Sequence, residues 1–60
     1  YVGKEGVVTV KVDNTAAQGQ VKVLGSIWTA RSADDSVIPV GANVTVRGIE
    51  GVKLLVELKI

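Results

Sequence analysis

The sequence predicts an all-β domain, a small barrel of five strands. Val, Ile and Thr supply 21 of its 60 residues, and such β-branched side chains favour a pleated sheet over a helix. Apolar and polar residues alternate with a period of two in short stretches, which Gly, Asn and Asp separate from one another. A sheet this small protects its edges by closing on itself, so a barrel is the expected architecture.

Five stretches show the alternation of a strand with one solvent-facing side. The expected strands cover residues 8–12, 20–24, 27–31, 43–48 and 53–57. In the first strand, Val8, Val10 and Val12 are expected to face inward. Thr9 and Lys11 then face the solvent.

Trp28 sets the orientation of the third strand. It shares a side with Ala30 and is expected to face inward, because the single Trp is the largest apolar side chain of so small a domain. Ile27 is then left on the outer side. In the fifth strand, Leu54 is expected inward and Leu55 outward. The expected core is Val8, Val10, Val21, Val23, Trp28, Ala30, Val44, Val46, Leu54 and Val56.

The segments around these strands are rich in turn-forming residues. Residues 13–19 and 32–36 are predicted loops because of their Asp, Asn, Ser and Gly content. Gly3 and Gly6 indicate a bend where one backbone passes close to another. Pro39 has no N–H to donate to a central ladder, so its segment is placed at an edge or between strands.

The composition lacks several of the residue types that enzymes use most often for catalysis. There is no Cys nucleophile and no His to act as a base, and Asp34 and Asp35 form the single pair of adjacent carboxylates. Adjacent residues of an extended segment point to opposite sides, so this pair is badly arranged to share a metal or a proton. We therefore expect no catalytic residue, no bound metal and no cofactor. The net charge of +1 predicts no strong attraction to nucleic acid or to an anionic membrane.

Four apolar residues fall where the alternation calls for a polar one. They are Leu24, Ile27, Ile49 and Leu55. Single exposed apolar residues are ordinary, but a contiguous patch of four would mark a surface for a partner or for self-association. Leu24 and Leu55 are the best candidates for such a contact.

The order of Gly, Val and Trp residues resembles the soluble C-terminal domain of the NfeD family. The similarity covers nearly the whole chain and centres on Trp28 and Ala30. It departs from the family pattern at residues 13–18, where a Pro and a tighter apolar pattern are often found. The matching positions are Gly3-x-x-Gly6, Val8, Val10, Gly19-x-Val21-x-Val23, Gly25-x-x-Trp28-x-Ala30-x-Ser32, Ile38-x-x-Gly41-x-x-Val44-x-Val46 and Ile49-x-Gly51-x-x-Leu54-x-Val56.

This resemblance implies a single OB-fold barrel over residues 1–60, the soluble C-terminal part of a longer membrane protein. It implies membrane-spanning segments before Tyr1, and the lack of any Met in the chain also indicates a piece of something longer. The implied partner is a stomatin-like or flotillin-like membrane protein, in membrane protease regulation or membrane quality control. The domain would then be a non-enzymatic interaction module in the aqueous phase, on the cytoplasmic side, with self-association as a further expectation.

Two other classes remain to be weighed. An OB-fold barrel that binds single-stranded nucleic acid needs a basic groove and several aromatic platforms, whereas the basic residues here are scattered and the chain has one Trp and one Tyr. A biotinyl or lipoyl carrier domain is also small and rich in Val. Such a domain carries its cofactor on a Lys in a Met-Lys-Met or Asp-Lys hairpin, and no Lys of this sequence lies in such a hairpin. The sequence therefore favours a protein-interaction module.

Overall fold

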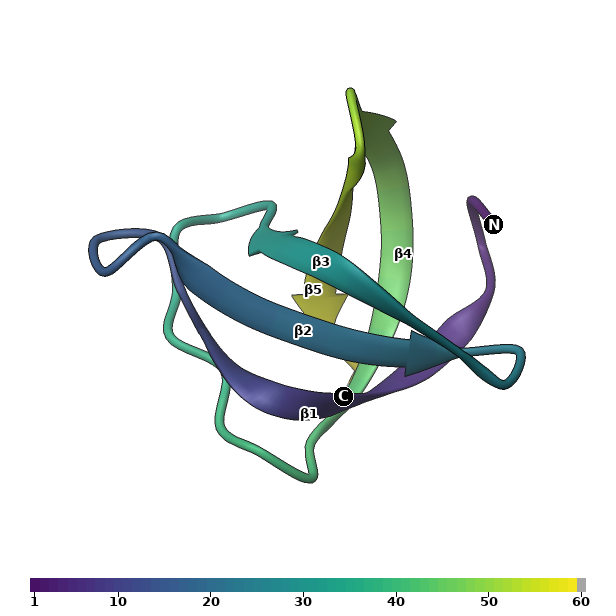
Figure 1. Ribbon diagram of the computed structural model, residues 1–60, viewed down its shortest axis with the longest axis horizontal. Coiled ribbons are helices and arrows are strands. Elements are labelled where there is room, and N and C mark those ends of the chain that lie inside the picture. The colour runs from purple at the N-terminus through teal and green to yellow at the C-terminus, as the bar shows by residue number, and fades with distance from the viewer. Residues whose placement is uncertain (60) are drawn as a thin grey trace.

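Five strands close into a barrel in the computed structural model, which describes residues 1–59 (Figure 1). The predicted fold class is confirmed, and each predicted strand is present with slightly different ends. Within residues 1–59 there is no helix of the length and apolar character needed to span a bilayer. The strands are β1 (Glu5–Asp13), β2 (Gln18–Val23), β3 (Ser26–Ser32), β4 (Asn43–Glu50) and β5 (Lys53–Leu58).

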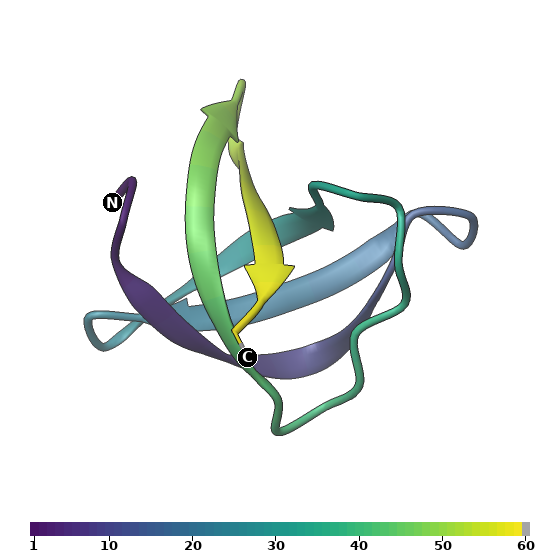
Figure 2. The same ribbon diagram turned by 180° about the vertical axis from the view of Figure 1, so that it is seen from behind.

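The order of the strands around the barrel is β1-β2-β3-β5-β4, and β1 closes the ring by pairing with β4. All neighbours run antiparallel except β3 and β5, which are parallel. This is the topology of the OB fold. Figures 1 and 2 show how β1 curves beneath the barrel to reach both of its neighbours.

The registers divide the barrel into two ends. At the first, which we call the hairpin end, lie residues 1–4, the β2–β3 turn at 24–25 and the β4–β5 turn at 51–52. At the other, the loop end, lie the β1–β2 loop at 14–17 and the β3–β4 loop at 33–42. In Figure 1 the hairpin end is to the right and top, and the two loops run at the left and below.

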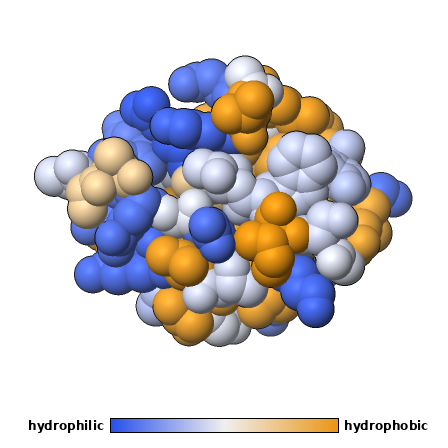
Figure 3. Space-filling view, in the orientation of Figure 1, coloured by the Kyte–Doolittle hydropathy of each residue, from blue (hydrophilic) through white to orange (hydrophobic). Residues whose placement is uncertain are grey.

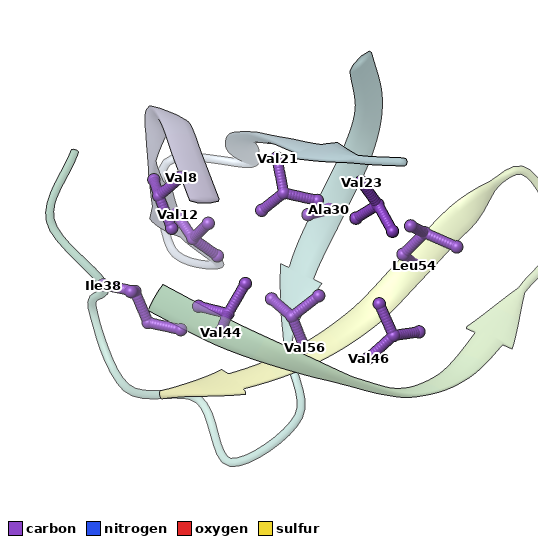
Figure 4. Close-up of a cluster of buried hydrophobic side chains, with 10 residues drawn as sticks. All are labelled: Val8, Val12, Val21, Val23, Ala30, Ile38, Val44, Val46, Leu54 and Val56. Atoms are coloured by element: carbon purple, nitrogen blue, oxygen red, sulfur yellow. The ribbon is translucent and has the colours of Figure 1, made fainter. Parts of the chain in front are cut away.

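Ten apolar side chains fill the barrel, and Figure 4 shows them pointing into a common interior. Eight of the ten predicted core residues are among them. The two additions are Val12 and Ile38, and the two exceptions are Val10 and Trp28. The core consists of Val8, Val12, Val21, Val23, Ala30, Ile38, Val44, Val46, Leu54 and Val56.

The prediction for Val10 was wrong because β1 does not keep a strict period of two. The β1–β2 register shifts between Val8 and Val10 and again between Val10 and Asp13. Such bulges rotate the residues between them, so Val10 is 39% exposed while Val12 is fully buried. The close approach predicted at Gly6 is confirmed, since a Cβ there would lie 2.6 Å from a methyl carbon of Val23. The same prediction for Gly3 was wrong, because an added Cβ there would meet nothing within 4 Å.

Different residues close the two ends of the barrel. Ile38 plugs the loop end, where its backbone exchanges two hydrogen bonds of 2.9 Å with Val12. Trp28 faces inward as predicted, because it is paired with the buried Val21, but it lies at the hairpin end and is only half-buried. The ring of Tyr1 meets it edge to face, with centroids 5.0 Å apart. Trp28 therefore covers the core at the hairpin end and does not lie at its centre.

The bulge in β1 predicts unequal effects of one substitution at two nearby positions. Val12→Thr buries a hydroxyl in the apolar interior and should lower the free energy of unfolding by about 1–3 kcal/mol. Val10→Thr places the same hydroxyl in solvent and should change it by less than about 0.5 kcal/mol. Urea unfolding of the two variants measures both values. Equal losses would contradict the bulged register.

Candidate protein-interaction surface

Two of the four predicted surface residues lie on the outer wall that β3 and β5 form. Leu55 is opposite Arg31 in the parallel β3–β5 ladder and opposite Gly48 in the β4–β5 ladder. Its side chain lies over Gly48, where an added Cβ would be 3.8 Å from Leu55 Cδ1, so Leu55 is half-buried without entering the core. Ile27 is exposed on the same wall, across from Lys22 of β2.

The other two surface residues lie at the hairpin end. Leu24 was expected to end the second strand, but it is the first residue of the β2–β3 turn. Leu24 and Gly25 have φ angles of 51° and 82°, the pattern of a type I′ turn. Ile49 shares its register with the buried Leu54, yet it is exposed because the β4–β5 hairpin extends beyond the closed part of the barrel.

These four residues do not form one contiguous patch. Ile27 precedes Arg31, the partner of Leu55, by four residues, which is about 13 Å along an extended strand. Leu24 and Ile49 belong to different hairpins. The four residues therefore lie apart, Ile27 and Leu55 at different points of the outer wall, and Leu24 and Ile49 in two hairpins of the hairpin end. Periodicity alone did not reveal this division.

A pocket of about 160 Å³ adjoins the outer wall, and the sequence did not predict it. It lies over β3, between the β1–β2 loop and the start of β5, which is where OB folds commonly bind their ligands. Two of its side chains, Arg31 and Lys53, are basic. Arg31 is 3.8 Å from Glu50 in an exposed ion pair. The lining residues are Asp13, Asn14, Ala17, Gln18, Thr29, Ala30, Arg31 and Lys53.

A polar network holds the rim of this pocket. The Asn14 side chain accepts a hydrogen bond from the Ser32 N–H and donates to the Ser32 carbonyl, both at 3.0 Å. It also donates to Asp35 at 2.7 Å. The carboxylate of Asp34 accepts from the hydroxyls of Ser36 at 2.6 Å and Ser32 at 2.8 Å. The two adjacent carboxylates therefore bind different partners: Asp35 fastens the 33–36 segment to Asn14 of the β1–β2 loop, and Asp34 binds Ser32 and Ser36 close to it in the sequence.

These hydrogen bonds act on the acidity of Asp34. They favour its charged form and lower its pKa from 3.8 to about 2, with the Ser36 hydroxyl as the largest cause and the Ser32 hydroxyl next. In the part of the chain that the structure describes, no three His, Cys, Asp or Glu side chains gather into a metal site.

The closed five-stranded barrel and its strand order define a domain of the OB-fold class. The chain belongs to the NfeD family: residues 1–57 match the NfeD-like C-terminal, partner-binding domain. The resemblance inferred from the sequence is thereby confirmed.

Two solved structures are similar to this chain over 98% of its length. One is the C-terminal domain of stomatin operon partner protein 1510-C from Pyrococcus horikoshii, with 30% identity, a TM-score of 0.87 and 88% of that chain covered. The other is the soluble domain of a membrane protein implicated in regulation of membrane protease activity from Corynebacterium glutamicum, with 37% identity, a TM-score of 0.88 and 92% covered. Among curated protein sequences, none matches significantly.

The lowered pKa of Asp34 predicts a pH-dependent contribution to stability. A carboxylate with a depressed folded-state pKa stabilises the fold above its unfolded pKa, and this contribution is lost as the pH falls from about 4 to about 2. We expect Asp34→Asn to be less stable than the parent chain near neutral pH and equally stable near pH 2. Thermal unfolding across this range measures the difference. A constant difference at all pH values would contradict the assignment.

The left-handed backbone at Leu24 predicts that a polar residue is more stable there. Asn tolerates positive φ better than Leu, so Leu24→Asn should raise the free energy of unfolding by about 0.5–1 kcal/mol. Leu24→Val, with its branched Cβ, should lower it. Urea unfolding compares the three chains. A destabilised Asn variant would show that Leu24 makes packing contacts that outweigh the backbone strain.

Proposed function

We propose that this domain is a non-enzymatic module that binds a stomatin-like protein and takes part in the regulation of a membrane protease. The names of the two similar structures support this class of partner and role. In this proposal the chain is the aqueous C-terminal part of a longer membrane protein, on the cytoplasmic side, with its membrane spans outside these 60 residues.

The observation that carries the proposal is the pairing of an apolar wall with a polar pocket on one face. Ile27 and Leu55 offer apolar area, and full burial of such side chains contributes about 1.5–3 kcal/mol each. Arg31 and Lys53, in the adjoining pocket, suit an acidic or carbonyl group of the partner. The ion pair of Arg31 with Glu50 is exposed and weak, so Arg31 can exchange it for a partner carboxylate.

The chemistry of the chain supports a role without catalysis. The sequence has neither Cys nor His. The hydroxyl of Ser32 is buried and donates to Asp34, and this occupies it in the loop network. The partner-binding description of the family agrees with such a role.

Binding of single-stranded nucleic acid is the alternative, and the position of the aromatic rings argues against it. OB folds stack bases on aromatic side chains over the outer faces of β2 and β3. Here Trp28 faces inward, and Tyr1 contacts it at the hairpin end. Among the described residues, the outward positions of β2 and β3 carry Gln20, Lys22, Ile27, Thr29 and Arg31.

The proposal predicts which substitutions abolish partner binding. The double variant Ile27→Thr/Leu55→Thr removes the apolar wall and keeps β-branched residues in both strands, so the barrel should still form. We expect its affinity for a stomatin-like protein from the same organism to fall by at least about tenfold, measured by isothermal titration calorimetry.

Val40→Thr is the matched control, because Val40 is exposed at the loop end, away from this wall. It should bind as the parent chain does. A folded double variant with unchanged affinity would overturn the proposal. Self-association that the double variant loses, without any binding of the stomatin-like protein, would identify a second copy of this chain as the partner.

A further inference from the structure

The hairpin end carries an exposed aliphatic side chain in each of its three turns. Val2 lies in a type II turn that the Lys4 N–H closes onto the Tyr1 carbonyl at 2.9 Å, and it is 62% exposed. Leu24 in the β2–β3 turn is 65% exposed, and Val52 in the β4–β5 turn is 80% exposed. Turn tips are ordinarily polar. The β3–β4 loop at the other end also exposes Val37 and Val40, so exposed aliphatic residues alone do not distinguish the hairpin end.

Each of these turns also carries a lysine next to its aliphatic residue. Lys4 follows Val2 within the same turn, Lys22 precedes Leu24 by two residues, and Lys53 follows Val52 directly. The ion pairs of residues 1–59 are Arg31–Glu50, Arg47–Glu57 and Lys59–Glu5, and none involves these three lysines. The positive charge of the hairpin end is therefore not neutralised by ion pairing within this part of the chain.

Two of the acidic residues outside those ion pairs, Asp34 and Asp35, lie in the β3–β4 loop at the other end of the barrel. The third, Asp13, lines the same pocket as Lys53. A net charge of only +1 therefore conceals an uneven distribution, with Lys4 and Lys22 at the hairpin end and Asp34 and Asp35 at the loop end. The positive end is the one with the aliphatic tips. Figure 3 shows hydrophobic side chains at the upper right, towards the hairpin end, and others across the centre and lower part, with hydrophilic ones mainly at the upper left and left.

We propose that the hairpin end rests on an anionic membrane surface. Val2, Leu24 and Val52 enter the boundary between headgroups and acyl chains, and Lys4 and Lys22 contact lipid phosphates. Separate protruding tips, each an aliphatic residue beside a lysine, suit a soft interface into which short apolar groups sink while their charged neighbours stay at the surface.

The aromatic pair Tyr1 and Trp28 also lies at the hairpin end. Tyr1 is partly exposed and contacts the half-buried Trp28 edge to face. Aromatic side chains favour the boundary between membrane and water, so their position agrees with a membrane contact at this end. Leu55 lies farther along the outer wall and stays free for a protein partner, whereas Ile27 is opposite Lys22 and borders the hairpin end. This inference goes beyond the proposed function and does not depend on it.

Labelling at single cysteines tests the contact directly, because the chain has no Cys of its own. Leu24→Cys, Val52→Cys and the loop-end control Val40→Cys are each labelled with a polarity-sensitive fluorophore. Vesicles of phosphatidylcholine and phosphatidylglycerol in equal parts should shift the emission to the blue at positions 24 and 52 and leave position 40 unchanged. Vesicles of phosphatidylcholine alone should have a much smaller effect. Added salt should reduce the shift, because part of the attraction is electrostatic.

Co-sedimentation with the same anionic vesicles provides the second measurement. The double variant Leu24→Asn/Val52→Ser should bind at least about tenfold more weakly than the parent chain. The Asn substitution suits the type I′ turn, so unfolding would not explain the loss. The single variant Leu55→Thr, on the outer wall, should sediment as the parent chain does.

Three results would overturn the inference. The first is a parent chain that does not bind the anionic vesicles. The second is an equal emission shift at all three labelled positions. The third is an emission at positions 24 and 52 that responds to the stomatin-like protein and not to vesicles, because a protein would then cover the tips.

Discussion

Closure of the barrel around small side chains is the constraint on which the rest of the structure depends. The interior is filled mostly by Val, so the ring must be narrow, and β1 must pair with β2 and also reach β4. Where β1 makes that crossing, at Gly6, any side chain would collide with the Val23 side chain and the Lys22 carbonyl. The same curvature turns Val10 outward and Val12 inward, so the strand that closes the ring is the one that breaks the alternation.

The strands and most of the core were predictable, because the alternation of apolar and polar residues indicates which side of a strand faces the core. Val21 and Val23 in β2 and Val44 and Val46 in β4 obey it and are buried. It fails where a residue's environment depends on distant segments. Ile38 is buried because its loop folds back onto Val12, a contact across 26 positions that no local pattern encodes.

The binding surfaces were predictable only in part, for the same reason. Leu24, Ile27 and Ile49 are exposed as expected, but their division between two regions follows from the registers of the ladders. The pocket exists because the β1–β2 loop comes to lie beside Lys53, which is far from it in sequence. The uneven distribution of charge between the two ends is likewise invisible to the net charge, since it depends on which turns share an end of the barrel.

The place of β5 between β3 and β4 has a consequence for the order in which the chain can fold. The β1–β2–β3 meander is local and can form early, but the edge of β3 that faces away from β2 stays unpaired until β5 is added. A nascent or truncated chain that lacks β5 therefore presents two open strand edges, on β3 and on β4, and such edges recruit strands of other chains. Completion of the last strand is thus what separates a soluble barrel from an aggregation-prone sheet, and its dependence on non-local pairing predicts slow folding.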